Sequence, residues 1–144
     1  MKKYIVEVYE DRTEWRNEAG ELHREDGPAI ELASGYKEWW VNGALHREDA
    51  PAIEVNDGYK ARYLNGQLHR EDGPAVEWSD GSKEWWVNGA RHRTDGPAVE
   101  RANNHKAWYL NGEKLTEAEF NNRGRKLIAT INVYSDGTVE RVEQ

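Results

Sequence analysis

A histidine followed by an arginine and acidic residues recurs four times along this chain, and these residue types could bind an ion. Each histidine lies 23 residues after the one before it. Histidine and carboxylates are metal ligands, whereas arginine together with histidine can hold a phosphate or another anion. The residues that these turns offer for anion binding are His23, Arg24, His46, Arg47, His69, Arg70, His92 and Arg93.

A metal site is not expected from these turns, because each copy supplies a single histidine. If each repeat is one hairpin, equivalent residues lie roughly 10 Å apart, so several copies cannot share one ion. The chain also has no cysteine. The alternative to an anion site is structural: each histidine and arginine then bonds the adjacent turn or an acidic residue of the next repeat, which makes a ladder along the array. We predict no metal and no cofactor.

Catalysis finds no support in the residue pattern. The chain has no thiol, and its serines stand in turns without the Gly-x-Ser-x-Gly context of a nucleophile. No glycine-rich loop precedes a helix to cradle a phosphate. Four near-identical units also lack the single asymmetric constellation that an active site needs. We therefore expect a non-enzymatic protein without catalytic residues.

Turn residues divide each 23-residue unit into short strands. Asn42-Gly43 and its later copies are typical of type I′ hairpin turns, which need positive φ at both positions. Gly27-Pro28, where the glycine is expected to supply positive φ, and Ser34-Gly35 mark two further breaks. Between the breaks lie strand candidates such as residues 29–32 and 36–41. Because a fixed period of this length indicates a repeat architecture, the sequence predicts an all-β fold, an elongated antiparallel sheet of stacked β-hairpin repeats.

The two ends depart from the repeat and are expected to cap it. We predict a single repeat domain over residues 1–144, in which 1–20 form a cap strand and half a repeat, 21–112 form four repeats, and 113–144 form the C-terminal cap. Thr116 and Glu119 make a capping-box pattern that predicts a short helix through about Asn122. Residues 126–134 and 138–143 flank an Asp136-Gly137 turn and predict a terminal hairpin, which packs on the end of the array or pairs with another chain.

Seven tryptophans and seven tyrosines are an unusual aromatic content for a chain that is one-third charged. Trp39 and Trp40 alternate between the two faces of their strand, so that repetition makes two columns of large side chains. One column is expected to form the core and the other an exposed ridge that contacts a partner. Arginine interrupts the first column, and tryptophan and arginine are enriched at binding hot spots. We therefore predict a partner-binding ridge of Trp39, Arg62, Trp85 and Trp108.

The segment from Trp40 to His46, followed by Asp57-Gly58, resembles a MORN repeat, which has the same 23-residue length and an aromatic-x-Asn-Gly-x-x-His pattern. The resemblance covers about residues 15–112. It departs after each histidine, where MORN units carry glycines and this chain has Arg-Glu-Asp-Gly-Pro. The whole phrase is also similar to repeats in proteins of tailed bacteriophages. The resemblance implies a scaffold or binding surface made of stacked hairpins.

A net charge of −7 argues against binding to nucleic acid or to anionic lipid, which need a basic surface. No apolar run approaches the ~20 residues of a membrane span, and the N-terminus lacks the apolar core of a signal peptide. We expect a cytoplasmic protein, in the host cell cytoplasm if it is phage-encoded, that binds a bacterial protein. The function expected from the resemblance is that of a phage accessory protein that inhibits a host defence protein.

Two alternative functions stay open at this point. The first is a small-molecule or nucleotide sequestering protein, in which the repeated His-Arg turns hold anionic groups. The second is a structural or assembly scaffold that self-associates through the C-terminal hairpin.

Overall fold

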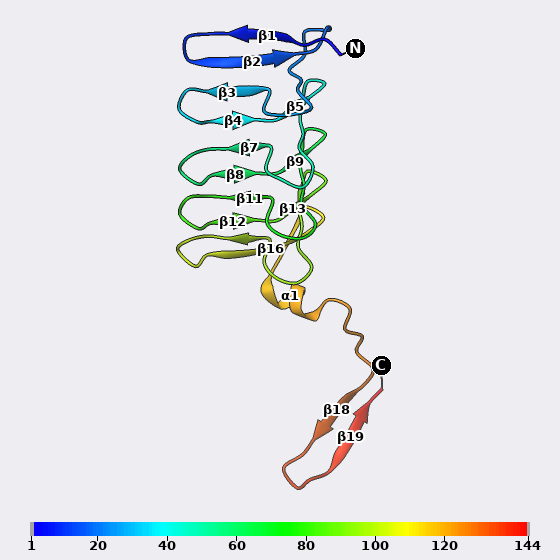
Figure 1. Ribbon diagram of the computed structural model, residues 1–144. Helices are drawn as coiled ribbons and strands as arrows, with labels where there is room; N and C mark the ends of the chain where they lie inside the picture. Colours follow the sequence, from blue (N-terminus) through cyan, green and yellow to red (C-terminus); the bar gives the residue numbers. More distant parts are fainter. Residues whose placement is uncertain (1, 144) are drawn as a thin grey trace.

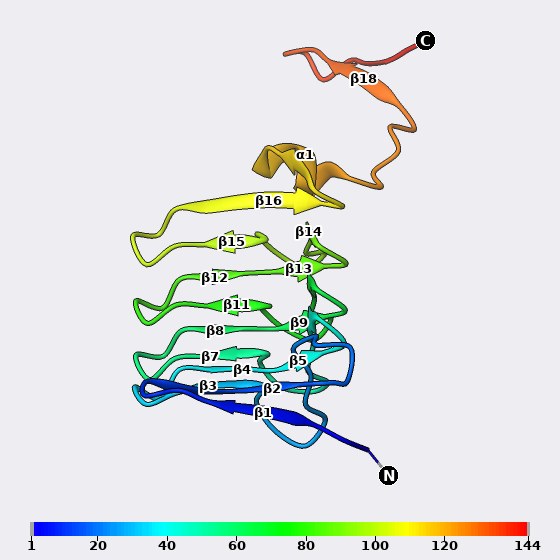
Figure 2. The same ribbon diagram turned by 90° about the horizontal axis from the view of Figure 1, so that it is seen from above.

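The computed structural model describes residues 2–143, and within them the chain forms an elongated stack of β-hairpins (Figure 1, Figure 2). An 11-stranded antiparallel sheet runs along the stack, and one short helix follows its last strand. The prediction of an all-β fold with stacked hairpin repeats is confirmed. Met1 and Gln144, the two ends of the predicted domain, lie outside the described residues.

The first three repeats each contribute one hairpin to the long sheet and one smaller hairpin beside it, whereas the fourth contributes both of its hairpins to the long sheet. In spatial order the sheet contains β1 (Ile5–Val8), β2 (Arg12–Arg16), β3 (Ile30–Leu32), β4 (Lys37–Glu38), β7 (Ile53–Glu54), β8 (Lys60–Ala61), β11 (Val76–Glu77), β12 (Lys83–Glu84), β15 (Val99–Glu100), β16 (Lys106–Leu110) and β17 (Glu113–Leu115). The small hairpins are β5 (Trp40–Val41) with β6 (Ala44–Leu45), β9 (Tyr63–Leu64) with β10 (Gln67–Leu68), and β13 (Trp86–Val87) with β14 (Ala90–Arg91). Figure 1 shows β5, β9 and β13 in a column of their own. The strand predicted over residues 36–41 is therefore divided at Trp39.

The glycines of the two kinds of turn are needed for different physical reasons. Asn42 and Gly43 have φ values of 47° and 77°, so both central positions of the Asn-Gly turn are left-handed as predicted. Gly27 does not have the positive φ expected of it, because its role is to leave space. A Cβ on Gly27 would lie 2.7 Å from the guanidinium carbon of Arg24, which folds back over this glycine.

The two faces of the sheet carry different residue columns, because paired residues of antiparallel strands share a face. One column alternates in charge from strand to strand, which stabilises the register. Its members are Glu31, Lys37, Glu54, Lys60, Glu77, Lys83, Glu100 and Lys106. The column on the opposite face is mixed apolar and acidic. Its members are Glu14, Ile30, Glu38, Ile53, Ala61, Val76, Glu84, Val99 and Ala107.

The innermost residues of the array are small. Ala29, Ala52 and Ala98 are 0% exposed, whereas every described tryptophan remains half-buried. Backbone N–H groups of Trp39 and Trp85 donate to the carbonyls of Ala52 and Ala98, so that each alanine lies beside a large side chain in the next strand. Neither aromatic column forms the closed core expected from the sequence, because a single-layer sheet cannot cover both of its faces.

The C-terminal residues depart from the repeat as predicted. Helix α1 (Glu117–Asn122) begins at a capping box formed by Thr116 and Glu119, and it buries Phe120. A separate hairpin of β18 (Thr130–Val133) and β19 (Val139–Val142) lies beyond it, apart from the array (Figure 1). All of residues 121–143 are exposed. Among the described residues, no helix has the length and apolar character that crossing a membrane requires.

Candidate functional site

Three clefts, which we call slots, lie between successive loops that carry the His-Arg pairs. The Trp39 slot and the Trp85 slot have volumes of about 640 and 610 Å³, and the Arg62 slot between them has about 290 Å³. Three of the four predicted ridge residues therefore line one slot each. The fourth, Trp108, lies in β16, on which helix α1 packs, and it does not line these slots.

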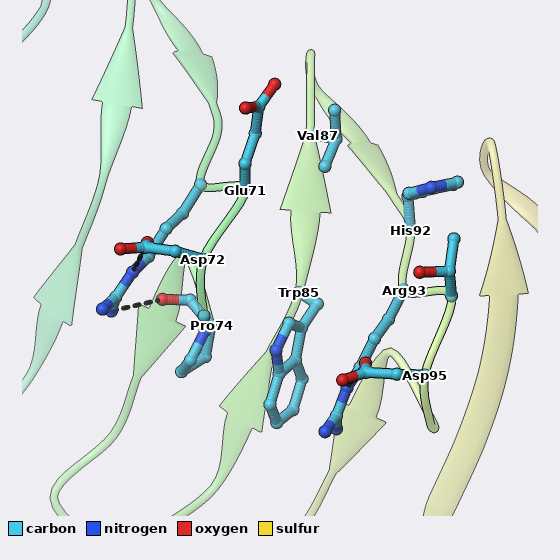
Figure 3. A pocket seen from close by; sticks show the side chains of 11 residues that line it. Glu71, Asp72, Pro74, Trp85, Val87, His92, Arg93 and Asp95 are labelled. Atoms are coloured by element: carbon cyan, nitrogen blue, oxygen red, sulfur yellow. Dashed lines mark hydrogen bonds and ion pairs between the residues drawn. The ribbon is translucent and has the colours of Figure 1, made fainter.

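The arginines beside the slots are held by internal acceptors. The Nε atoms of Arg24, Arg70 and Arg93 donate to the carboxylate two residues further on at 2.9, 2.8 and 2.8 Å. A terminal nitrogen of each also donates to the carbonyl of the following proline, at 3.2, 3.1 and 3.1 Å. Figure 3 shows both interactions beside Asp72 and Pro74. Part of the donor capacity of these guanidinium groups is therefore used within the loop.

The His-Arg loop of the second repeat differs from that of the first at one position. Ala50 stands where the other repeats have glycine, and Asp49 adopts a positive φ of 59°. Arg47 donates to the Pro51 carbonyl at 3.0 Å and to Glu54 at 3.1 Å instead of to the loop aspartate. The extra Cβ is thus tolerated because the arginine changes its partner.

Stacking on tryptophan further fixes the arginines. The guanidinium carbons of Arg47 and Arg93 lie 3.8 Å from the ring centroids of Trp39 and Trp85. This distance is typical of a cation–π contact. Figure 3 shows the Trp85 ring between the loop of Asp72 and Pro74 and the loop of Arg93 and Asp95.

The four histidines join successive repeats. The Nδ1 atom of His69 accepts a hydrogen bond of 3.0 Å from the backbone N–H of Asn88, which begins the next Asn-Gly turn. The same bond forms at His23, His46 and His92, with lengths of 2.9, 3.0 and 2.9 Å. Nδ1 can accept only without a proton, so each neutral ring carries its proton on Nε2. The structural ladder considered for these residues is therefore present.

The outer rim of the slots is acidic. Asp72 has 82% of its side chain exposed, whereas its partner Arg70 has 22%. Hydrogen bonds from the adjacent arginines hold the pKa of Asp26, Asp72 and Asp95 below its ordinary value, so these groups stay charged at neutral pH. The positive charges thus lie inside and the negative charges outside.

The opposite face of the sheet buries carboxylates instead. Glu84 is 4% exposed and accepts hydrogen bonds from the Trp86 indole at 2.8 Å and from Arg101 at 2.7 Å. Glu38 accepts from the Trp40 indole at 2.6 Å. These carboxylates orient the indoles of Trp40 and Trp86, and none of the three slots opens on them.

This arrangement defines the class of protein: a β-hairpin repeat array with slots between its loops. Comparison with protein-family models, with curated proteins and with solved structures finds no match for this chain. Residues 2–143 contain no group of three or more histidine, cysteine or acidic side chains placed to hold a metal ion.

The sequence indicated the slot residues but not the acidic rim. The 23-residue period and the alternation of strand faces placed Trp39, Arg62 and Trp85 in one column, and the presence of an arginine in that column selected it. The rim residues Glu25, Asp26, Glu48, Glu71, Asp72 and Asp95 repeat with the histidines, and that periodicity was the available signal. Either the arginine or the aspartate of a pair can face the solvent. The loop conformation decides between them, and the residue types alone do not determine that conformation.

Proposed function

We propose that this chain is a non-enzymatic module that binds another protein through the slotted face. The observation that carries the proposal is the series of three adjacent slots, two of which are lined by a tryptophan ring. Tryptophan and arginine supply much of the binding energy at protein interfaces, and open aromatic surface on a repeat array marks a docking face.

We further propose that the chain is a phage-encoded accessory protein that inhibits a bacterial defence protein. Support for this origin is the likeness of the Asn-Gly-x-x-His-Arg-x-Asp-Gly-Pro phrase to repeats in tailed-phage proteins, together with the wider likeness to MORN repeats. Expression of the chain in bacteria that carry a defence system should raise the plating efficiency of a sensitive phage. Unchanged plating against every system tested would remove the inhibitor proposal but leave the binding module.

Replacing Trp39 and Trp85 together by alanine should abolish capture of the partner. The tagged chain is used to isolate proteins from bacterial lysate, and a stoichiometric protein is expected with the wild type. The matched control replaces Trp40 and Trp86, which are the same residue type on the opposite face and are also half-buried. Retention of the partner by the Trp39/Trp85 variant, with both variants folded by circular dichroism, would contradict the proposal.

Self-association is a second candidate function, which the C-terminal hairpin favours. Ile131, Val133 and Val139 are 55%, 67% and 59% exposed, so the hairpin presents apolar side chains that no other part of residues 2–143 covers. If the hairpin joins copies, sedimentation velocity should show a dimer or larger species for the full chain and a monomer for a chain ended after Arg125. A monomer at all concentrations of the full chain would exclude it.

A further inference from the structure

We propose that the Trp39 and Trp85 slots bind two basic side chains, six residues apart, of one extended protein segment, and that the Arg62 slot between them receives a non-basic side chain. The proposal rests on the proposed function, because it gives the chemistry of the partner for the same face. It follows from the charge of the rim, from the aromatic lining, from a contact within the chain and from the repeat spacing.

Charge at the rim selects a cation. Two arginines and three carboxylates line the Trp39 slot, and the Trp85 slot has the same balance. In the Trp85 slot, Asp72 and Asp95 are 82% and 81% exposed while Arg70 and Arg93 are 22% and 20% exposed. A ligand that approaches from solvent therefore meets carboxylates first. An anionic ligand would have to displace Asp72 or Asp95 from its arginine.

The tryptophan ring suits the stem of a basic side chain. Arg47 and Arg93 already stack on Trp39 and Trp85, which shows that these indoles accept a cationic group. One guanidinium covers one face of a ring, and the remaining indole surface lines the slot. The methylenes of a lysine or arginine can pack on this surface while the charged end reaches the rim carboxylates.

The chain itself supplies an ion pair between a lysine and a rim carboxylate, at the first repeat. Its N-terminal segment lies on the Trp15 position, where the amino group of Lys2 pairs with Glu25. The Tyr4 ring packs edge-on against Trp15, with ring centroids 5.5 Å apart. Glu25 is itself one of the carboxylates that line the Trp39 slot, and Glu71 is its equivalent at the Trp85 slot. The first repeat has no His-Arg loop before it, and a segment with a basic and an aromatic residue therefore already lies at its tryptophan.

The spacing of the slots sets the spacing of the ligand residues. Trp39 and Trp85 are two repeats apart, which is four strand spacings or about 19 Å. Six residues of a polyproline II segment span about 19 Å, and its three-residue turn directs every third side chain to the same side. Residues i, i+3 and i+6 of such a segment would face the Trp39, Arg62 and Trp85 slots.

The middle slot discriminates against a basic residue. Arg62 stands where the neighbouring slots have tryptophan, and three arginines and three carboxylates line this smaller space. A third cation there would lie beside Arg62 without an indole to stack on. An aspartate at i+3 would instead gain an attractive contact.

Four labelled peptides and the full chain test the proposal by fluorescence anisotropy at low ionic strength. The matching peptide is Lys-Pro-Pro-Asp-Pro-Pro-Lys, and its isomer Lys-Pro-Asp-Pro-Lys-Pro-Pro has the same composition with the lysines four apart. The others are Lys-Pro-Pro-Lys-Pro-Pro-Lys and the charge-reversed Glu-Pro-Pro-Lys-Pro-Pro-Glu. The matching peptide should bind at least about tenfold tighter than its isomer, because only it fills both slots at once.

Variants then assign the contacts. Trp85→Ala should reduce the affinity for the matching peptide to that for the isomer, and Trp86→Ala, on the opposite face, should leave it unchanged. Arg62→Trp should make the peptide with a central lysine the tighter ligand. Equal binding of the matching peptide and its isomer, preference for the charge-reversed peptide, or no effect of Trp85→Ala would each overturn the proposal.

Failure here is distinguishable from failure of the proposed function. If a protein is captured from lysate and lost with the Trp39/Trp85 variant while the peptides bind without regard to spacing, the slotted face binds a protein but not by this pattern. The proposal about basic residues is then wrong and the binding module stands.

Discussion

Ala98→Leu should unfold the chain at a lower denaturant concentration than any conservative change on its surface. Ala98 is 0% exposed, and its carbonyl accepts from the Trp85 N–H at 2.8 Å, so the backbone cannot move away from the neighbouring strand. The same register places Trp108 on its other side. Three additional heavy atoms between two tryptophans must displace an indole, and overpacking of this kind costs about 1–3 kcal/mol.

Urea unfolding followed by circular dichroism measures this effect, and Ala102→Leu is the matched control. Ala102 lies in the exposed turn of the same repeat, and only its backbone N–H is engaged, with the Ser82 hydroxyl. The control should leave the free energy of unfolding within about 0.5 kcal/mol of wild type. An equal stability of the Ala98 variant and the control would show that the alanine column is not tightly packed.

The role of these alanines explains why the sequence predicted the architecture better than the packing. Asn42-Gly43 and the 23-residue period act locally, so the turns and the stacked hairpins could be predicted from residue types. Burial depends on what lies beside each strand. Tryptophan was expected in the core, but the array is one layer thick, and only alanine fits between the large side chains of adjacent strands.

Neighbouring repeats also alternate in residue type at some positions, which gives a second period of 46 residues, and the structure provides a physical reason for it. Glu38 and Glu84 each accept a hydrogen bond from the indole of the tryptophan two residues further on. The intervening repeats have Ala61 and Ala107 at this position, followed by a tyrosine two residues later. An acidic residue thus occurs where an indole N–H needs an acceptor.

The candidate site was predicted in part for the same reason. Arg62 could be assigned to the column of Trp39 from strand alternation alone. Trp108 adjoins a helix, whereas the other three positions line slots. This difference could not be predicted, because it depends on where α1 packs. The direction of the Arg70 and Asp72 side chains likewise follows from a loop in which arginine folds back over Gly73.

His69→Ala should weaken the joint between two repeats by about 1–2 kcal/mol. The imidazole Nδ1 accepts from Asn88 N–H at 3.0 Å, and its loss leaves this amide with water as its only partner and removes a ring from the interface. In a repeat array, stability is a sum over units and their interfaces, so a defect at one interface also loosens the neighbouring turn. The variant should therefore show a lower urea midpoint together with faster amide exchange at Asn88.

His105→Ala is the control for this prediction, because it removes the same ring from an exposed turn. The hydrogen bonds of His105 there are made by its backbone, whose N–H donates to the Asn103 side chain and whose carbonyl accepts from the Arg101 N–H at 2.9 Å. Faster exchange at Asn88 but not at Asn65 would localise the damage to the joint that His69 makes, since Asn65 is held by His46. If His69→Ala and His105→Ala had the same urea midpoint and the same Asn88 exchange, the histidines would not join the repeats.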